Sequence, residues 1–117
     1  MAFANNGNDV VLLPAGTVVT VTGNGPAVRL DNKASIRIQS VVTAVAGTSP
    51  SVTVKVQTSH DGSTGWADVG SALTAQTAAN DSGVKVVGLI DRYVRAAYTV
   101  SGSAGQSLTL GVYGEAV

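Results

Sequence analysis

The sequence predicts an all-β protein, an antiparallel β-sandwich of jelly-roll type with about eight strands. Aliphatic residues alternate with polar residues in several segments, and this two-residue period is typical of half-buried strands. Clusters of Gly, Asn, Asp, Ser and Pro separate these segments about every ten residues, as they do in sandwiches and barrels. No window of the chain carries an apolar stripe at helical spacing.

The predicted strands follow from these segments in chain order. In the segment from Ser35, Ile36 and Ile38 are expected to face the core. The early run Val18–Thr22 and the later run Val84–Val87 are rich in β-branched residues, which favour strands. The predicted strands, of which one or two are expected to merge, are Asp9–Leu13, Thr17–Thr22, Ala27–Leu30, Ser35–Val45, Ser51–Ser59, Ala67–Leu73, Val84–Leu89, Arg92–Val100 and Ser107–Tyr113.

Three further segments share the alternating pattern. Their expected core-facing residues are Val52, Val54 and Val56, then Val94, Ala96, Tyr98 and Val100, and finally Leu108, Leu110 and Val112. We expect Ser35–Val45 to form a long hairpin with Ser51–Ser59, and Arg92–Val100 to form a second hairpin with Ser107–Tyr113. The segment Ala72–Ala79 is expected to be a strand or an extended connection.

The length of 117 residues indicates one domain. We expect a single sandwich over residues 9–117, preceded by a short flexible arm over residues 1–8. This arm is polar and Asn-rich, and Phe3 is its apolar anchor. We predict partner contacts through Phe3, Asn5 and Asn6, because an arm of this kind can reach a neighbouring subunit. The alternative is a terminus that frays without function.

The charge pattern excludes several partners. The net charge is zero, charged residues make up 12% of the chain, and the seven basic residues are scattered. This argues against a phosphate-binding patch for nucleic acid and against a basic membrane-surface helix. No apolar stretch is long enough to span a bilayer, and the first residues do not resemble a signal peptide. We therefore expect synthesis in the cytoplasm.

Residues that carry chemistry are sparse, and we expect no enzyme, no metal and no cofactor. The chain has no cysteine and one histidine, which argues against zinc and thiol sites. His60 and Asp61 are adjacent, and adjacent strand residues point to opposite faces, so their spacing does not build a catalytic relay. The aspartates in the loops do not match a calcium-binding loop, and Gly23–Pro26 is not a phosphate loop because no helix follows it.

Trp66 is the one aromatic residue that invites a functional interpretation. It follows the loop Asp61–Gly65. An exposed Trp66 would offer a stacking surface for a sugar, whereas a buried one would plug the end of the core. We favour the plug, because buried rings are the commoner case, and keep Trp66 as a candidate partner-binding residue.

Four segments carry a resemblance to a known family. They are Thr48–Gln57, Asp61–Val69 with its Asp-Gly-Ser-Thr-Gly-Trp turn, Asp91–Ala96 with its Arg-Tyr-Val-Arg-Ala strand, and Ser107–Leu110. Together they resemble the small β-sandwich structural proteins of tailed-phage virions, including capsid decoration (cement) proteins. The resemblance covers about residues 35–113. It implies a sandwich fold, no catalysis, and many copies bound to capsid or tail subunits.

The leading functional expectation is therefore a capsid decoration protein located in the virion. Its partners would be the major capsid protein or other virion subunits, with homo-oligomers as a further possibility. Two alternatives remain open at this point. One is a component of the phage tail or connector, and the other is a glycan-binding module for host recognition.

Overall fold

The computed structural model describes residues 9–31, 33–88 and 90–116. All regular structure in these ranges is β-strand, which confirms the all-β prediction. The predicted arm, with Phe3, Asn5 and Asn6, lies outside the described residues. The seven strands are β1 (Asp9–Val19), β2 (Gly23–Asn24), β3 (Val28–Arg29), β4 (Ser35–Ser59), β5 (Ala67–Val69), β6 (Ser82–Gly88) and β7 (Tyr93–Ala116).

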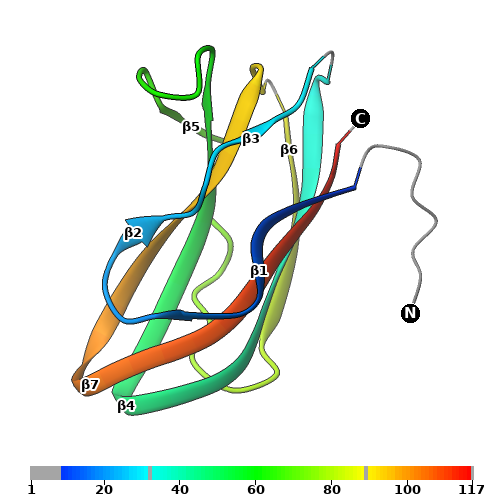
Figure 1. Cartoon of the computed structure of the whole chain (residues 1–117). Helices are drawn as coiled ribbons and strands as arrows, with labels where there is room; N and C mark the ends of the chain where they lie inside the picture. Colours follow the sequence, from blue (N-terminus) through cyan, green and yellow to red (C-terminus); the bar gives the residue numbers. More distant parts are fainter. Residues whose placement is uncertain (1–8, 32, 89, 117) are drawn as a thin grey trace.

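Hydrogen bonds join all seven strands into one antiparallel sheet. Its main order is β1-β7-β4-β5, while β2 and β3 also pair with β7, and β6 pairs with β4. The two longest strands, β4 and β7, pair with each other along almost their whole length, from Ile36 opposite Ala116 to Ser59 opposite Tyr93. This long two-stranded ribbon organises the fold (Figure 1).

The β4–β7 ribbon bends at one corner, where its register shifts between Ala46 and Ser51. Residues with positive φ gather there, with Gly47 at 93° on β4, and with Gly102 at 135° and Gly105 at 75° on β7. Glycine adopts this conformation at no steric cost, whereas other residues are strained. Figure 1 shows both strands turning at this corner.

The corner divides the sheet into two halves. The β1–β6 half contains β1, β6, residues 35–46 of β4 and residues 107–116 of β7. The β2–β5 half contains β2, β3, β5, residues 51–59 of β4 and residues 93–101 of β7.

Both predicted hairpins are therefore wrong. Ser35–Val45 and Ser51–Ser59 are parts of one bent strand, and each pairs with β7 instead of with the other. The same holds for Arg92–Val100 and Ser107–Tyr113 within β7. The predicted strands Asp9–Leu13 and Thr17–Thr22 are likewise replaced by a single β1 that ends at Val19. The turn-forming residues at 47–50 and 102–105 bend a paired ribbon here instead of reversing a single strand.

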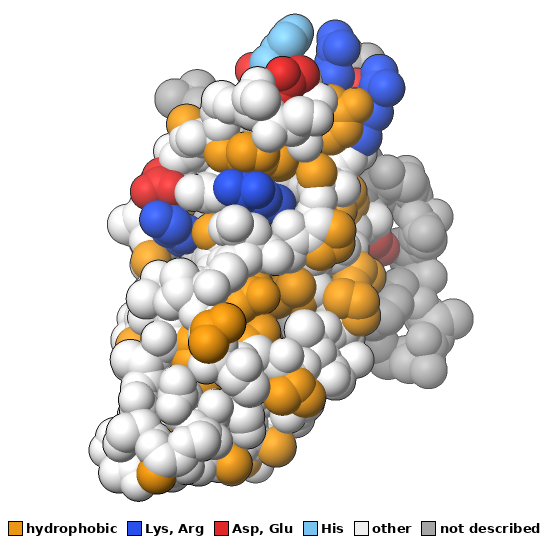
Figure 2. All heavy atoms as spheres, turned by 60° about the vertical axis from the view of Figure 1, so that its left-hand side comes forward, with side chains coloured by type: hydrophobic (Ala, Val, Ile, Leu, Met, Phe, Trp, Pro, Cys, Tyr) orange, Lys and Arg blue, Asp and Glu red, His pale blue; other side chains and the backbone are white. Residues whose placement is uncertain are grey.

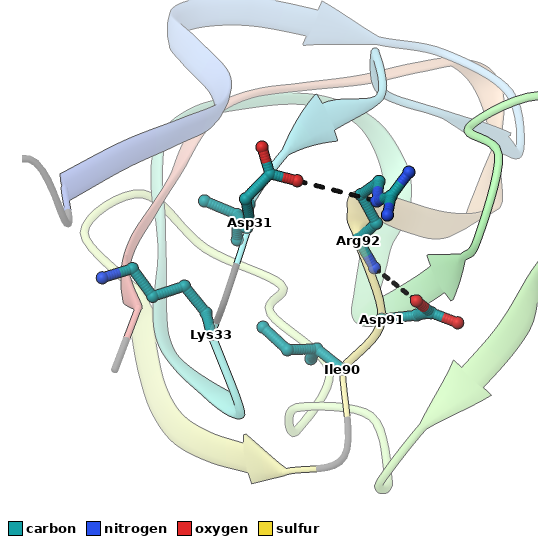
Figure 3. Close-up of a pocket in the computed structure, with 6 residues that line it drawn as sticks. Asp31, Lys33, Ile90, Asp91 and Arg92 are labelled. Carbon is teal, nitrogen blue, oxygen red and sulfur yellow. Dashed lines mark hydrogen bonds and ion pairs between the residues drawn. The ribbon is translucent and has the colours of Figure 1, made fainter.

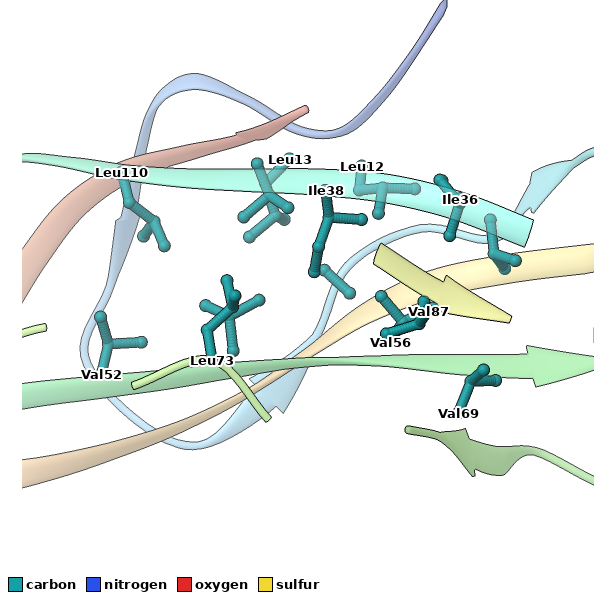
Figure 4. Close-up of a cluster of buried hydrophobic side chains, with 14 of the residues drawn as sticks. Leu12, Leu13, Ile36, Ile38, Val52, Val56, Val69, Leu73, Val87 and Leu110 are labelled. Carbon is teal, nitrogen blue, oxygen red and sulfur yellow. The ribbon is translucent and has the colours of Figure 1, made fainter. Parts of the chain in front are cut away.

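The core lies between the two halves, and the predicted core faces are confirmed. Ile36, Ile38 and Leu110 from the β1–β6 half are buried, as are Val52 and Val56 from the β2–β5 half. In Figure 4 the labelled side chains of the two halves point toward one another across the core. The segment between β5 and β6 closes one side through buried Leu73 and Gln76. As predicted, this segment is an extended connection, with one isolated bridge between Gln76 and Val52.

Candidate contact sites

Trp66 lies on the outer face of the β2–β5 half. Its side chain is half-buried, and it belongs neither to the buried core nor to the residues packed against it. The guanidinium of Arg95 lies over the indole ring, 4.2 Å from its centroid. The prediction that Trp66 plugs the core is therefore wrong. Arg95 alternates with core-facing Val94 and Ala96, so it points outward, and Trp66 packs against that outer side.

Arg95 continues into a chain of polar contacts that crosses three strands. Its Nε donates to Gln57 Oε1 at 2.9 Å, and Gln57 Nε2 donates to Asp68 Oδ1 at 3.0 Å. Lys55 Nζ donates to the other carboxylate oxygen of Asp68, also at 3.0 Å. The hydrogen bond from Gln57, and then the one from Lys55, hold the pKa of Asp68 below its usual value. We call Trp66, Arg95, Gln57, Asp68 and Lys55 the Trp66 network.

The Trp66 network has the geometry of a structural clamp. It joins the loop before β5 to β4 and β7, and the side chains of Arg95, Gln57, Asp68 and Lys55 each have a hydrogen-bond partner within it. Arg95 covers one face of the indole, so a sugar would have to displace it in order to stack there. The sequence could not show this arrangement, because it depends on the register that sets Gln57 opposite both Asp68 and Arg95.

The loop after β4 is held by Asp61. Its carboxylate accepts hydrogen bonds from the backbone N–H groups of Ser63 and Thr64, each at 2.9 Å. It also accepts from the Thr64 hydroxyl at 2.8 Å and from the Ser59 hydroxyl at 3.1 Å. These bonds, led by those from the Thr64 and Ser63 backbone, hold the pKa of Asp61 far below its usual value. Asp61 is thus a loop-organising residue.

His60 does not contact Asp61. Its Nδ1 lies 3.2 Å from Asp91 Oδ1, and its side chain is 75% exposed. The backbone N–H of Arg92, and then His60, lower the pKa of Asp91. Next to this pair, the Thr58 hydroxyl accepts from the Asp91 backbone N–H at 2.7 Å and donates to the Tyr93 carbonyl at 2.8 Å.

A small hollow of about 200 Å³ lies at the same end of the molecule. It is lined by Leu30, Asp31, Lys33, Ile90, Asp91 and Arg92. Asp31 pairs with Arg29 at 2.9 Å, and its other oxygen lies 3.7 Å from Arg92; Figure 3 shows Asp31 and Arg92 directed toward each other. Because the ion pairs neutralise charges of both signs, the hollow does not favour an anion or a cation.

Charged side chains gather toward this end of the protein. Figure 2 shows blue and red groups in its upper part, whereas the lower part, toward the corner of the ribbon, is hydrophobic or uncharged. Within the described ranges, no group of three or more His, Cys, Asp or Glu side chains is placed to hold a metal ion. No helix long and apolar enough to cross a membrane is found there either.

Exposed aliphatic side chains mark a third surface, which sequence reasoning missed. Five valines are exposed in the described part of the chain: Val11, Val18, Val21, Val84 and Val86, with exposed fractions of 52–68%. A groove of about 760 Å³ lies on the outer face of the β1–β6 half, between Val11 and Val84. The signal in the sequence was Val84 and Val86 at strand spacing, but the pattern alone does not show which face the core covers.

Comparisons with known proteins add no family to this description. No protein-family model matches the chain, and no curated protein matches it.

Proposed function

We propose that this chain is a structural protein of a tailed-phage virion, and specifically a capsid decoration protein that binds the assembled shell and stabilises it. The observation that carries the proposal is the set of exposed valines. Valine is among the residues most often buried, and exposed apolar side chains that gather on one surface mark contact sites. The resemblance of residues 35–113 to phage structural proteins is the reason for proposing a virion as the particle and a capsid subunit as the partner.

A sandwich architecture is part of this proposal. The bent β4–β7 ribbon, with core side chains from both halves directed inward, supports describing the sheet as two packed layers. Such a domain is stiff, because its core is close-packed, and it presents loops and outer faces to its neighbours. A decoration protein needs these properties, since it must resist deformation of the shell that it bridges.

The polar residues support a protein that works by contact. His60, Asp61 and Asp68 each take part in contacts that hold loops or strands in place. No buried side-chain polar atom in the described residues lacks a partner. We infer that the protein has no reactive centre and that its activity is mechanical.

Val18 and Val21 are proposed as the contact to a capsid subunit. They are 59% and 68% exposed, and they lie outside the residues that line the groove. A standard specific interface buries about 1,600 Å², and the many copies on a shell would multiply a weaker contact by avidity. Of the predicted contacts of the N-terminal arm, those by Asn5 and Asn6 would add to this interface, whereas Phe3 is assigned below to the chain's own groove.

The experiment is co-sedimentation of the purified protein with capsid shells that lack it, together with quantitative mass spectrometry of complete virions. We expect saturable binding to the shell and at least one copy per several capsid subunits. Val18→Glu with Val21→Glu should weaken binding at least tenfold, whereas Thr99→Glu, at an exposed position on β7, should not. Absence of the protein from virions, or equal binding by both variants, would overturn the proposal.

A further inference from the structure

The groove on the outer face of the β1–β6 half is an apolar surface without a cover in the described structure. It is lined by Asp9, Val10 and Val11 of β1, by Arg37, Ile38 and Gln39 of β4, by Val84 of β6, and by Tyr113, Gly114 and Glu115 of β7. The opposite face of these strands packs on the core. The exposed valines on this outer face, Val11 and Val84 in the groove lining, are the apolar part that a cover would shield from water.

The strand register places the groove residues in two rows. Val11, Tyr113, Gln39 and Val84 lie opposite one another across the four strands, so they share one face. The hydroxyl end of the Tyr113 side chain lies close to Gly111, where a Cβ would approach it to 2.3 Å. The Tyr113 ring therefore lies along β7, and valines stand at both sides of the groove.

The charges next to this row indicate an uncharged occupant. In the second row, Arg37 Nη2 lies 2.8 Å from Glu115 Oε1, so these two charges compensate each other, and Asp9 at the rim is the remaining charged residue of the lining. The first row, Val11, Tyr113, Gln39 and Val84, carries no charge, so an uncharged segment suits it. An apolar segment between the valines would gain the hydrophobic contribution of about 25 cal/mol per Å² of buried area.

The edge of β6 argues against a second copy that would extend the sheet beside the groove. Lys85 lies between Val84 and Val86 in β6, and its ammonium hydrogen-bonds the Ser71 hydroxyl. A lysine in an edge strand disfavours pairing with another strand. In an antiparallel pair of two β6 strands centred on this residue, the two Lys85 side chains would face each other, which is unfavourable.

The sequence before Asp9 has the properties that the groove requires. Residues 1–8 contain no charged side chain, and Ala2, Phe3 and Ala4 form an apolar stretch. Asn5–Asn8 then includes Asn-Gly, a strong turn signal that would reverse the chain direction. Asp9 itself lines the groove, so this segment is joined to the chain at the groove's rim.

The segment before Asp9 is also long enough to reach across the groove. Four neighbouring strands span about 15 Å at roughly 4.8 Å per spacing. The six residue-to-residue steps from Phe3 to Asp9 reach at most about 20 Å when extended, which leaves room for the turn. A short tether gives an effective concentration in the millimolar range, so the chain's own segment has an advantage over any free molecule.

We propose that this groove binds the chain's own N-terminal segment, with the Phe3 side chain seated between Val11 and Val84. The segment then shields the apolar face of the β1–β6 half from water and from other copies. This inference does not rest on the proposed virion function, because it concerns the isolated chain.

Introduced cysteines test the proposal cleanly, since the natural chain has none. In the double variant Ala4→Cys with Gln39→Cys, which keeps Phe3, we expect oxidation to give a disulfide within one chain. The control is Ala4→Cys with Thr99→Cys, because Thr99 is exposed on the β2–β5 half. We expect the first variant to form its bond at least tenfold faster, measured by mass spectrometry of the monomer.

Two outcomes would overturn the proposal. Equal rates in the two variants would show that the segment does not prefer the groove, and a disulfide between two chains would identify a second copy as the occupant. A further variant separates docking from chance collision. Val84→Lys in the Ala4→Cys, Gln39→Cys background should slow the reaction several-fold, and an unchanged rate would likewise contradict apolar docking.

Discussion

The side chain of Gln76 is held against Ser40 by two hydrogen bonds across the open side of the core. Gln76 Oε1 accepts from the Ser40 hydroxyl at 2.7 Å, and Gln76 Nε2 donates to the Ser40 carbonyl oxygen at 2.9 Å. The Gln76 backbone also exchanges hydrogen bonds with Val52 at 2.9 and 3.0 Å. Because Ser40 and Val52 lie on opposite sides of the corner in β4, this one residue ties the two halves together.

Replacing Gln76 should therefore be costly. Gln76→Ala removes both side-chain bonds and leaves a cavity at a position that is 3% exposed. We expect a loss of about 2–4 kcal/mol in the free energy of unfolding, measured by urea denaturation. Thr74→Ala, in the same connection but exposed, should change it by less than about 0.5 kcal/mol. Similar values for the two variants would contradict the role of Gln76.

The corner of the ribbon should not tolerate a side chain at position 47. A Cβ on Gly47 would lie 2.6 Å from the Gln106 Cα, and the backbone there has φ of +93°. Steric overlap and backbone strain together should cost Gly47→Ala about 2–4 kcal/mol. Gly65→Ala is the matched control, because its φ is +67° and no atom lies within 4 Å of the added Cβ. It should lose only about 1 kcal/mol, so thermal unfolding should rank the two clearly.

Removing Arg95 should uncover Trp66. The chain has a single tryptophan, so its fluorescence reports on this ring alone. Arg95→Ala is expected to shift the emission to longer wavelength, to increase quenching by acrylamide, and to lower stability by roughly 0.5–1 kcal/mol. Arg37→Ala, which removes an exposed arginine on the other half, should leave the emission unchanged. An unaltered spectrum in Arg95→Ala would show that Arg95 does not cover the ring in solution.

The Asp61 loop should make the protein sensitive to acid. Its carboxylate has a pKa below the ordinary value of about 3.9 because backbone N–H groups stabilise the charged form. The contribution of ionised Asp61 to folding stability is complete above the ordinary pKa. It is lost as the pH falls through the lower pKa that Asp61 has in the folded state. NMR of the carboxyl carbon should show Asp61 still ionised at about pH 3.5. A titration midpoint at the ordinary value of about 3.9 would refute this account.

The sequence predicted the strands better than their pairing. The alternation that placed Ile38, Val54 and Leu110 in the core is local, and the structure confirms it. Whether a Gly-rich stretch reverses one strand or bends a pair depends on which strand lies alongside, and that partner is distant in the chain. The hairpin predictions failed for this reason.

The same limit applies to the surfaces. Trp66 was identified as a residue of interest, but the outward-pointing Arg95 that covers it belongs to β7, 29 residues later in the chain. The groove combines residues of four strands, so no single segment carries its signature. The prediction that His60 and Asp61 do not form a relay is consistent with the separate partners that they have in the structure.

The ribbon of β4 and β7 has a consequence for how the chain reaches its native state. Arg37 at the start of β4 pairs with Glu115 at the end of β7, 78 residues away. Such distant pairing is entropically expensive to initiate and is associated with slow folding. During synthesis, the first half of β4 can pair with β6 on one side, but its other edge must wait for the end of β7. That open edge and the unfinished core are then exposed until late in translation, when nascent chains are prone to aggregation or chaperone binding.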